Sequence, residues 1–147
     1  MSQGFLERFL VVARDVTQAE RSLAMDTEGH IVQVDNIDPA DLESESFKRF
    51  AIDNLKQAIN SGETVIANNV ITDIAEAPTT NTNFANLRFI VAFPVAEHGA
   101  IYLDRHISSG VISRRVVERL MRFLDHVLKN HLEDQDTAAL RTLYDQL

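Results

Sequence analysis

The sequence predicts an α+β domain, with a central, mainly antiparallel sheet flanked by helices. Strand-like segments come in pairs joined by short turns, which is the pattern of antiparallel hairpins. Segments with helical spacing of apolar residues lie before, between and after these pairs. In segment 88–95 both alternating sets of side chains are apolar, which is typical of a central strand covered on both faces.

The first half of the chain predicts a helix, a hairpin and a second helix. Residues 4–16 repeat apolar side chains at helical spacing in two adjacent rows. Alternating residues on either side of a turn at 26–29 predict two strands. Residues 37–62 are expected to form one helical segment, which starts at the cap Asp38–Pro39 and ends at Gly62.

The second half is expected to run strand, polar loop, hairpin and two helices, in the order 63–69, 70–87, 88–95 with 99–105, 113–131 and 137–147. Long loops inside compact domains are uncommon and often bind ligands. We expect one domain over residues 1–132, which includes the helices at both ends, and an amphipathic helical extension over 133–147.

The bulk composition restricts the classes of function. The 147 residues suit one domain with a sizeable core, and the net charge of −8 works against binding nucleic acid or an anionic membrane. The chain has no cysteine, which removes disulfides, thiol nucleophiles, thiolate metal sites and thioether-linked chromophores. No stretch approaches the roughly 20 apolar residues of a membrane span. We therefore expect a cytoplasmic protein without a nucleic-acid or membrane partner.

Several local motifs follow one another in a fixed order along the chain. A helix ends in Gly62, and a strand with a small and polar end follows at 65–69. A later strand closes on the hydrophobic–Pro–hydrophobic turn at 93–95, and the strand "GAIYLD" follows at 99–104. In this order and at this spacing the motifs resemble the GAF domain family, in which "GAIYLD" matches the last strand. The resemblance covers roughly residues 4–131, and similar sheets in PAS domains are the structural alternative.

This resemblance implies an antiparallel sheet with the terminal helices on one face and a small-molecule pocket on the other. GAF domains usually act as sensory or regulatory modules that pair through their terminal helices. The wide apolar faces at 5–16 and 116–132 fit such pairing, because apolar rows left over after covering a sheet need a further partner. The candidate residues for the dimer helices are Phe5, Phe9, Val12, Val117, Leu120, Leu124 and Leu128.

The chain also departs from specialised members of the family. No lysine follows Asn68–Asn69, and Ser113, Arg114 and Arg115 stand where cyclic-nucleotide-binding members carry acids. Bilin attachment and methionine-sulfoxide reduction in this family use cysteine, which the chain lacks. These departures argue against all three activities.

The polar loop and its flank supply the candidate pocket residues, because in GAF-like folds this segment borders the ligand pocket. They are Asp73, Thr79, Thr80, Asn81, Phe84, Arg88 and Phe89. Asp73 and Arg88 are expected to pair with each other or to bind a charged ligand. Phe89 stands where family members often have a small or polar residue, so it is also a candidate to fill the cavity and leave it without a ligand.

Acid, imidazole and hydroxyl groups follow one another at Asp104, His106 and Ser108. Residues two apart on a strand have Cβ atoms about 7 Å apart, which is too far for a hydrogen-bonded relay. We expect Asp104 to anchor the following loop, or to cap the helix that starts near Ser113. No metal site is expected, since His126 and His131 are one residue too far apart for a helical pair.

These observations predict a non-enzymatic regulatory or sensory module of the GAF type, a homodimer through its terminal helices that binds a small molecule. Two alternatives stay open. One is a dimerisation scaffold with a collapsed, ligand-free pocket, and the other is a small enzyme that uses the groups of residues 104–109. The sequence names neither a cofactor nor the ligand.

Overall fold

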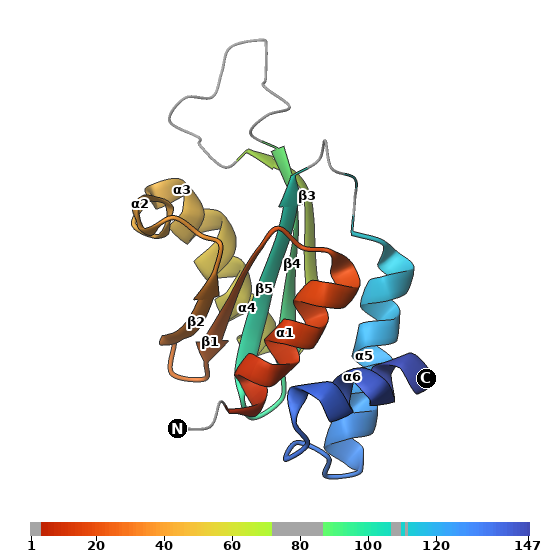
Figure 1. The fold of residues 1–147 in the computed structure, drawn as a ribbon. Helices are drawn as coiled ribbons and strands as arrows, with labels where there is room; N and C mark the ends of the chain where they lie inside the picture. Colours follow the sequence, from red (N-terminus) through yellow and green to blue (C-terminus); the bar gives the residue numbers. More distant parts are fainter. Residues whose placement is uncertain (1–3, 72–86, 107–109, 111) are drawn as a thin grey trace.

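The computed structural model describes residues 4–71, 87–106, 110 and 112–147 (Figure 1). Most of the predicted loop 70–87 therefore lies outside the described residues. The elements in chain order are α1 (Phe5–Thr17), β1 (Arg21–Asp26), β2 (Ile31–Asp35), α2 (Pro39–Leu42), α3 (Glu45–Phe47), the π-helical turn η1 (Lys48–Ile52), α4 (Asp53–Ser61), β3 (Val65–Ile71), β4 (Leu87–Val95), β5 (Gly99–His106), α5 (Arg114–Lys129) and α6 (Thr137–Gln146).

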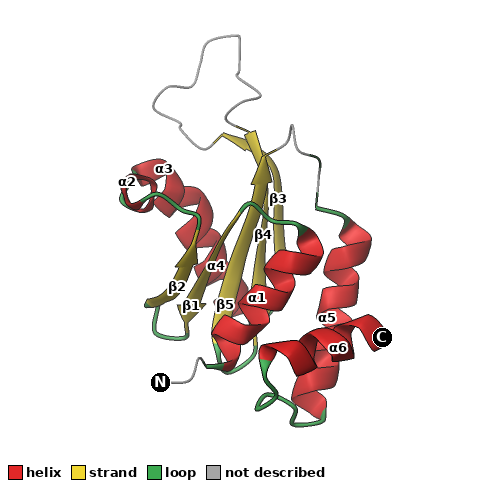
Figure 2. Cartoon of the chain, viewed as in Figure 1, coloured by secondary structure: helices red, strands yellow, loops and turns green. Residues whose placement is uncertain are grey.

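The five strands form one sheet in the order β2-β1-β5-β4-β3, and every pair of neighbours is antiparallel. Helices cover both faces of this sheet, with α1, α5 and α6 on one side and α2 to α4 on the other (Figures 1 and 2). The predicted α+β class with an antiparallel sheet flanked by helices is confirmed. In the described part of the chain no helix is both long and apolar enough to cross a membrane.

The sheet separates two apolar cores. The core on the side of α1, α5 and α6 includes Phe9, whose ring centroid lies 5.8 Å from that of Phe93 and 6.1 Å from that of Phe123. The core on the side of α4 contains Ile90 and Ala92 of the same strand β4. The expectation that β4 is a central strand with two apolar faces is therefore confirmed.

The segment 37–62 differs from the single helix that its spacing predicts. Ser44 interrupts it, because the hydroxyl of Ser44 accepts a hydrogen bond from the backbone N–H of Phe47 at 3.1 Å and starts a new helix there. Asp38 stands at the cap position of α2 but makes no side-chain cap bond. The predicted end at Gly62 is confirmed, since this glycine takes a left-handed backbone with φ +71°.

Candidate functional site

Asp104, the acid at the centre of the suspected catalytic group, is fully buried and paired with Arg21. The two residues lie opposite each other on β5 and β1. The Arg21 Nε donates to both carboxylate oxygens, at 3.0 and 2.9 Å, and Nη2 donates to Oδ2 at 2.6 Å. The hydroxyl of Tyr102 donates to the same Oδ2 at 2.5 Å. The carboxylate thus accepts hydrogen bonds from the guanidinium of Arg21 on β1 and from the hydroxyl of Tyr102 on β5, its own strand.

The charge of Arg21 is stabilised at the same place. Burial works against the cationic form, but the hydrogen bonds and the negative charge of Asp104 outweigh it, so the pKa of Arg21 is raised. The guanidinium carbon lies 5.7 Å from the ring centroid of Phe47, and Nη1 lies 3.6 Å from the exposed carboxylate of Asp41. The pair joins β1, β5 and the α2–α3 segment on one face of the sheet.

The sequence did not predict Arg21 and Tyr102 as partners of the Asp104 carboxylate. The cap position of α5 at Ser113 has no side-chain cap bond. The anchoring of the following loop by Asp104 stays a prediction, because residues 107–109 and 111 lie outside the described ones. The backbone N–H of His106 donates to Oε1 of Glu20 at 2.6 Å. Ser108 lies outside the described residues. The sequence missed Arg21 as the partner because the pairing depends on the register of two strands that are distant in the chain.

Of the seven predicted pocket residues, the structure describes the backbone of Arg88 and the whole of Phe89. Asp73, Thr79, Thr80, Asn81 and Phe84 lie outside the described residues. The backbone of Arg88 pairs with that of His106 on β5. Phe89 is half-buried and packs against the core of α1, α5 and α6. Its side chain therefore faces the terminal helices.

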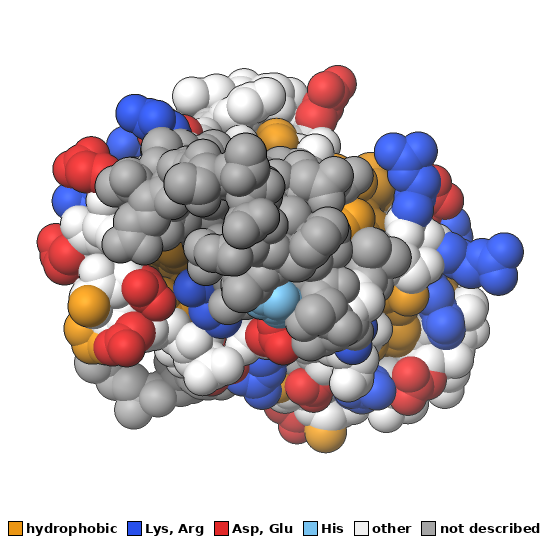
Figure 3. Space-filling model, turned by 90° about the horizontal axis from the view of Figure 1, so that it is seen from above, with side chains coloured by type: hydrophobic (Ala, Val, Ile, Leu, Met, Phe, Trp, Pro, Cys, Tyr) orange, Lys and Arg blue, Asp and Glu red, His pale blue; other side chains and the backbone are white. Residues whose placement is uncertain are grey.

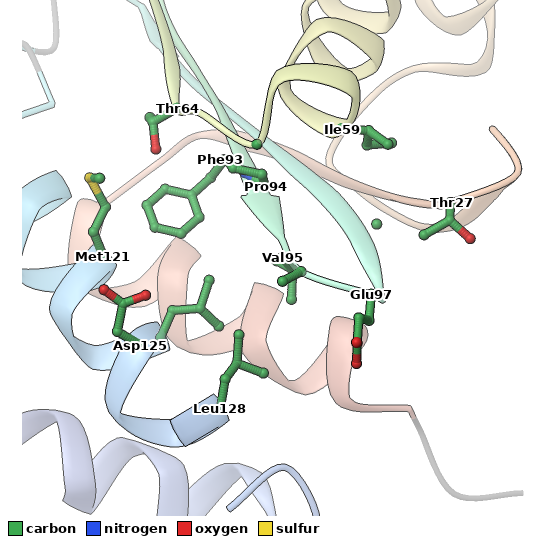
Figure 4. Close-up of a pocket in the computed structure, with 14 residues that line it drawn as sticks. Thr27, Ile59, Thr64, Phe93, Pro94, Val95, Glu97, Met121, Asp125 and Leu128 are labelled. Atoms are coloured by element: carbon green, nitrogen blue, oxygen red, sulfur yellow. The ribbon is translucent and has the colours of Figure 1, made fainter. Parts of the chain in front are cut away.

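A cavity of about 270 Å³ lies between the end of β4 and helix α5, and we call it the α5 cavity (Figure 4). It is lined by Thr27, Ile59, Gly62, Thr64, Phe93, Pro94, Val95, Ala96, Glu97, Gly99, Met121, Leu124, Asp125 and Leu128. Phe89, the predicted pocket residue whose side chain the structure describes, is not among them. The α5 cavity borders the terminal-helix side of the sheet, whereas the family resemblance implies a pocket on the other face.

Strand register explains why the α5 cavity exists. The first described pair between β3 and β4 is Val65 with Ala92, so the last three residues of β4 extend past the start of β3. These residues pair only with β5, through Pro94 with Ala100 and Val95 with Gly99. Proline has no N–H to offer a further strand, which suits an unpaired edge. Helix α5 flanks the gap, and Figure 4 shows its side chains facing β4.

The walls of the α5 cavity are apolar and the ionisable groups are acidic. Phe93, Val95 and Leu124 are buried in the core and form the floor. Met121 is 41% exposed and stands at the rim. The two ionisable side chains in the lining are Glu97 and Asp125, and both are exposed. A mostly apolar cavity with a few polar groups is the usual form of a small-molecule site.

The turn between β4 and β5 fixes the mouth of the α5 cavity. The N–H of His98 bonds to the carbonyl of Val95 at 2.9 Å. Gly99 has φ +137°, and a Cβ on it would lie 1.9 Å from the carbonyl oxygen of Met25, so this position requires glycine. Glu97 takes a left-handed backbone with φ +69°. The turn therefore holds Glu97 in one place relative to β1 and β5.

The candidate residues for the dimer helices pack inside the single chain. Six of them are at most 5% exposed, namely Phe5, Phe9, Val12, Val117, Leu120 and Leu124, and Leu128 is half-buried. Helix α6, in the predicted extension 133–147, contributes Leu140 and Tyr144 to the same core. The apolar faces of residues 5–16 and 116–132, which were predicted to contact a partner chain, are thus covered by the sheet and by α6 of the same chain.

Metal binding has no support in the part of the chain that the structure describes. No three histidine, aspartate or glutamate side chains there come together as a metal site. Basic side chains gather on the side of the molecule where α5 lies (Figure 3). Of the arginines on this helix, Arg114, Arg115 and Arg122 are exposed, and Arg119 is half-buried.

Comparisons with known proteins concern the fold. No protein-family model matches the chain, and no curated protein matches it. Among solved structures, Myxococcus xanthus MglB is 14% identical with a TM-score of 0.46, and the match covers 90% of this chain and 93% of that one. The GAF domain/HD domain protein from Geobacter sulfurreducens is 12% identical with a TM-score of 0.49, over 97% and 93% of the two chains. A structure of MglB with tetrameric arrangement is 12% identical with a TM-score of 0.46, over 99% and 94%. At these identities and scores the likenesses assign no function to this chain.

Proposed function

We propose that this protein is a regulatory module, in which a small molecule bound in the α5 cavity acts on the terminal-helix layer. The observation that carries the proposal is the composition of the cavity wall. Phe93 and Val95 at the end of β4 face Met121 and Leu128 of α5 across one space (Figure 4), and Leu124 of the same helix also lines it. A ligand there touches sheet and helix at once, so its binding energy depends directly on where α5 lies.

We propose a binding function and not an enzymatic one. In the suspected catalytic group, Asp104 is engaged by three donor groups, which favours a structural role for its carboxylate. The motif resemblance at 88–95 and 99–104 to a family of sensory modules supports the same proposal. We place the module in the cytoplasm, for which the absence of cysteine is the supporting observation.

Pairing of two chains belongs to the proposal, and we place it on α5 at the rim of the α5 cavity. The inner side is covered, since Val117 and Leu120 are buried in the chain's own core. Met121 is the large apolar side chain that α5 leaves exposed, and it also lines the α5 cavity. Ligand binding and pairing would then share one surface, which couples them.

Light scattering tests the pairing. Wild-type protein at high micromolar concentration is expected to be a dimer, and Met121→Glu is expected to be a monomer because it puts a charge into the contact. Arg122→Gln is the matched control, since it changes the net charge by the same amount at the next, exposed residue of α5. A monomeric wild type, or a Met121→Glu protein as dimeric as the control, contradicts pairing through this surface.

Native mass spectrometry of protein purified from cells tests the ligand. The proposal predicts a retained small molecule in the wild type and its loss in Phe93→Trp, because the larger ring fills the floor of the cavity. The alternative of a scaffold with an empty pocket predicts the bare chain mass in both proteins, even when small apolar molecules are added back.

A further inference from the structure

We infer that the α5 cavity takes an organic cation, a small apolar body that carries an ammonium or guanidinium group. This inference rests on the proposed function and adds the chemical class of the ligand. The apolar part follows from the floor of Phe93, Val95 and Leu124. A cavity of about 270 Å³ lies just below the roughly 300–1,000 Å³ of drug-sized ligands. One aromatic ring or a short aliphatic chain suits that space.

The charge of the ligand follows from the ionisable groups in the lining. Among the described residues, the lining contains two carboxylates, Glu97 and Asp125, and no lysine, arginine or histidine. Asp125 lies one helical turn beyond Met121 on the same face of α5. Neither carboxylate has an ion-pair partner among the residues described here. An anionic ligand would meet two like charges, whereas a cation would supply the counter-charge that the described part of the chain does not.

The end of helix α4 adds to this preference. Ile59 in its last turn and Gly62 at its C-cap both line the cavity. The carboxyl end of a helix carries a partial negative charge that favours cations. The last turn of α4 has no basic side chain to compensate that charge. Three separate elements, the β4–β5 turn, α5 and α4, thus present negative charge to the same cavity.

The backbone at Glu97 gives an independent reason to assign it a binding role. Its φ of +69° is a conformation that glycine or asparagine adopts with less strain than glutamate. The turn itself therefore gives no reason for a glutamate at this position. Recognition of a cation at the mouth of the cavity does give one, since strained residues gather where a side chain is held for binding.

Calorimetric titration with three matched probes tests the inference. The probes are 2-phenylethylammonium, 2-phenylethanol and 3-phenylpropanoate, which share one aromatic body and differ in charge. We expect the ammonium to bind tightest and the carboxylate weakest. Asp125→Asn and Glu97→Gln should each weaken ammonium binding about two- to five-fold, the range of an exposed ion pair, and leave binding of the alcohol unchanged. Added salt should weaken only the ammonium.

Glu45→Gln is the control, because it removes one negative charge from an exposed residue of α3 that does not line the cavity. It should leave all three affinities as in the wild type. Equal binding of ammonium and alcohol, or an Asp125→Asn protein that keeps the full preference, overturns the cationic class and leaves the proposed binding function standing. Binding of none of the probes at millimolar concentration counts against both.

Discussion

At the scale of single residues, Asp104 has no exposed surface, and its carboxylate accepts hydrogen bonds from Arg21 and Tyr102. Removing water from both charges is costly, and the interaction stabilises the fold only because all the donors are well placed. The loss of one partner leaves the other charge buried without the counter-charge that faces it. The pair therefore matters most for holding β1 and β5 in register at this end of the sheet.

Asp104→Leu is expected to lower the free energy of unfolding by up to about 3–5 kcal/mol, since the buried Arg21 guanidinium then keeps only the exposed carboxylate of Asp41 as an ion-pair partner among the described residues. Tyr102→Phe should lower it by about 1.5–3 kcal/mol, the value of a hydrogen bond to a charged group. The double variant Arg21→Met, Asp104→Leu should recover much of the first loss, because no charge is left unpaired. Urea unfolding measures all three. If Asp104→Leu and the double variant lose the same free energy of unfolding, the cost of burying the Arg21 charge does not depend on Asp104.

Asp26 is predicted to give the hairpin β1–β2 a pH-dependent stability. Its carboxylate accepts the backbone N–H groups of His30 and Glu28, both at 2.9 Å, and the bond from His30 is the main cause that lowers the pKa of Asp26. A lowered folded pKa stabilises the fold above the ordinary aspartate value of about 3.9, and this stabilisation is lost as the pH falls through the folded value. The difference in unfolding free energy between wild type and Asp26→Ala should therefore shrink as the pH falls from about 6 to about 3. A difference that stays constant over this range would contradict the role of the ionised carboxylate.

At the scale of elements, α6 closes the core that α1 and α5 leave open. Its side chains Leu140 and Tyr144 are buried there. Arg119 of α5 holds its end, because Nη2 donates to the carbonyls of Tyr144 at 3.0 Å and of Leu147 at 3.2 Å. The guanidinium also lies 4.5 Å from the centroid of the Tyr144 ring. A cation at the carboxyl end of a helix is favourable, so Arg119 fastens α6 to α5.

Arg119→Ala is expected to lower the free energy of unfolding by about 1–3 kcal/mol, through the lost cation–π contact and hydrogen bonds. Relative to the wild type, amide hydrogen exchange in this variant should speed up more in α6 than in the sheet. Arg115→Ala, an exposed arginine of the same helix, should change stability by no more than about 0.5 kcal/mol. If both variants behave alike, Arg119 does not hold α6.

The local spacing of apolar residues predicted most helices and strands. The α5 cavity and the Arg21–Asp104 pair instead depend on the register between strands that are distant in the sequence. The alternation in β4 predicts a strand with two apolar faces, and both faces are covered. The spacing of residues 37–62 predicts one helix, but the cap bond of Ser44 splits it. The α5 cavity depends on where β3 starts opposite β4, at Val65 with Ala92. Arg21 meets Asp104 only through strand register. Neither the register of β3 against β4 nor the pairing of Arg21 with Asp104 can be predicted from a short stretch of sequence.

At the scale of the whole molecule, the sheet divides two cores, and the α5 cavity lies at the edge of the one that contains both terminal helices. Because of this position, a ligand in the α5 cavity would contact both the sheet and a terminal helix, which explains how binding could regulate the protein. A ligand that contacts Phe93 on the sheet and Met121 and Leu128 on α5 can shift the helix only if the two helix positions differ in their contacts with it. Regulation through the α5 cavity therefore requires that ligand binding and the mobility of α5 change together.

Hydrogen–deuterium exchange tests this requirement most directly, with and without whichever of the three aromatic probes binds tightest. We expect the bound probe to slow exchange at the end of β4 and in the turn after it, residues 93–99, and along α5 at residues 121–128. Exchange in β1 and β2 should stay unchanged. Saturating probe that leaves 93–99 and 121–128 as they were, or that slows exchange only in α2 to α4, would contradict a ligand site that acts on α5.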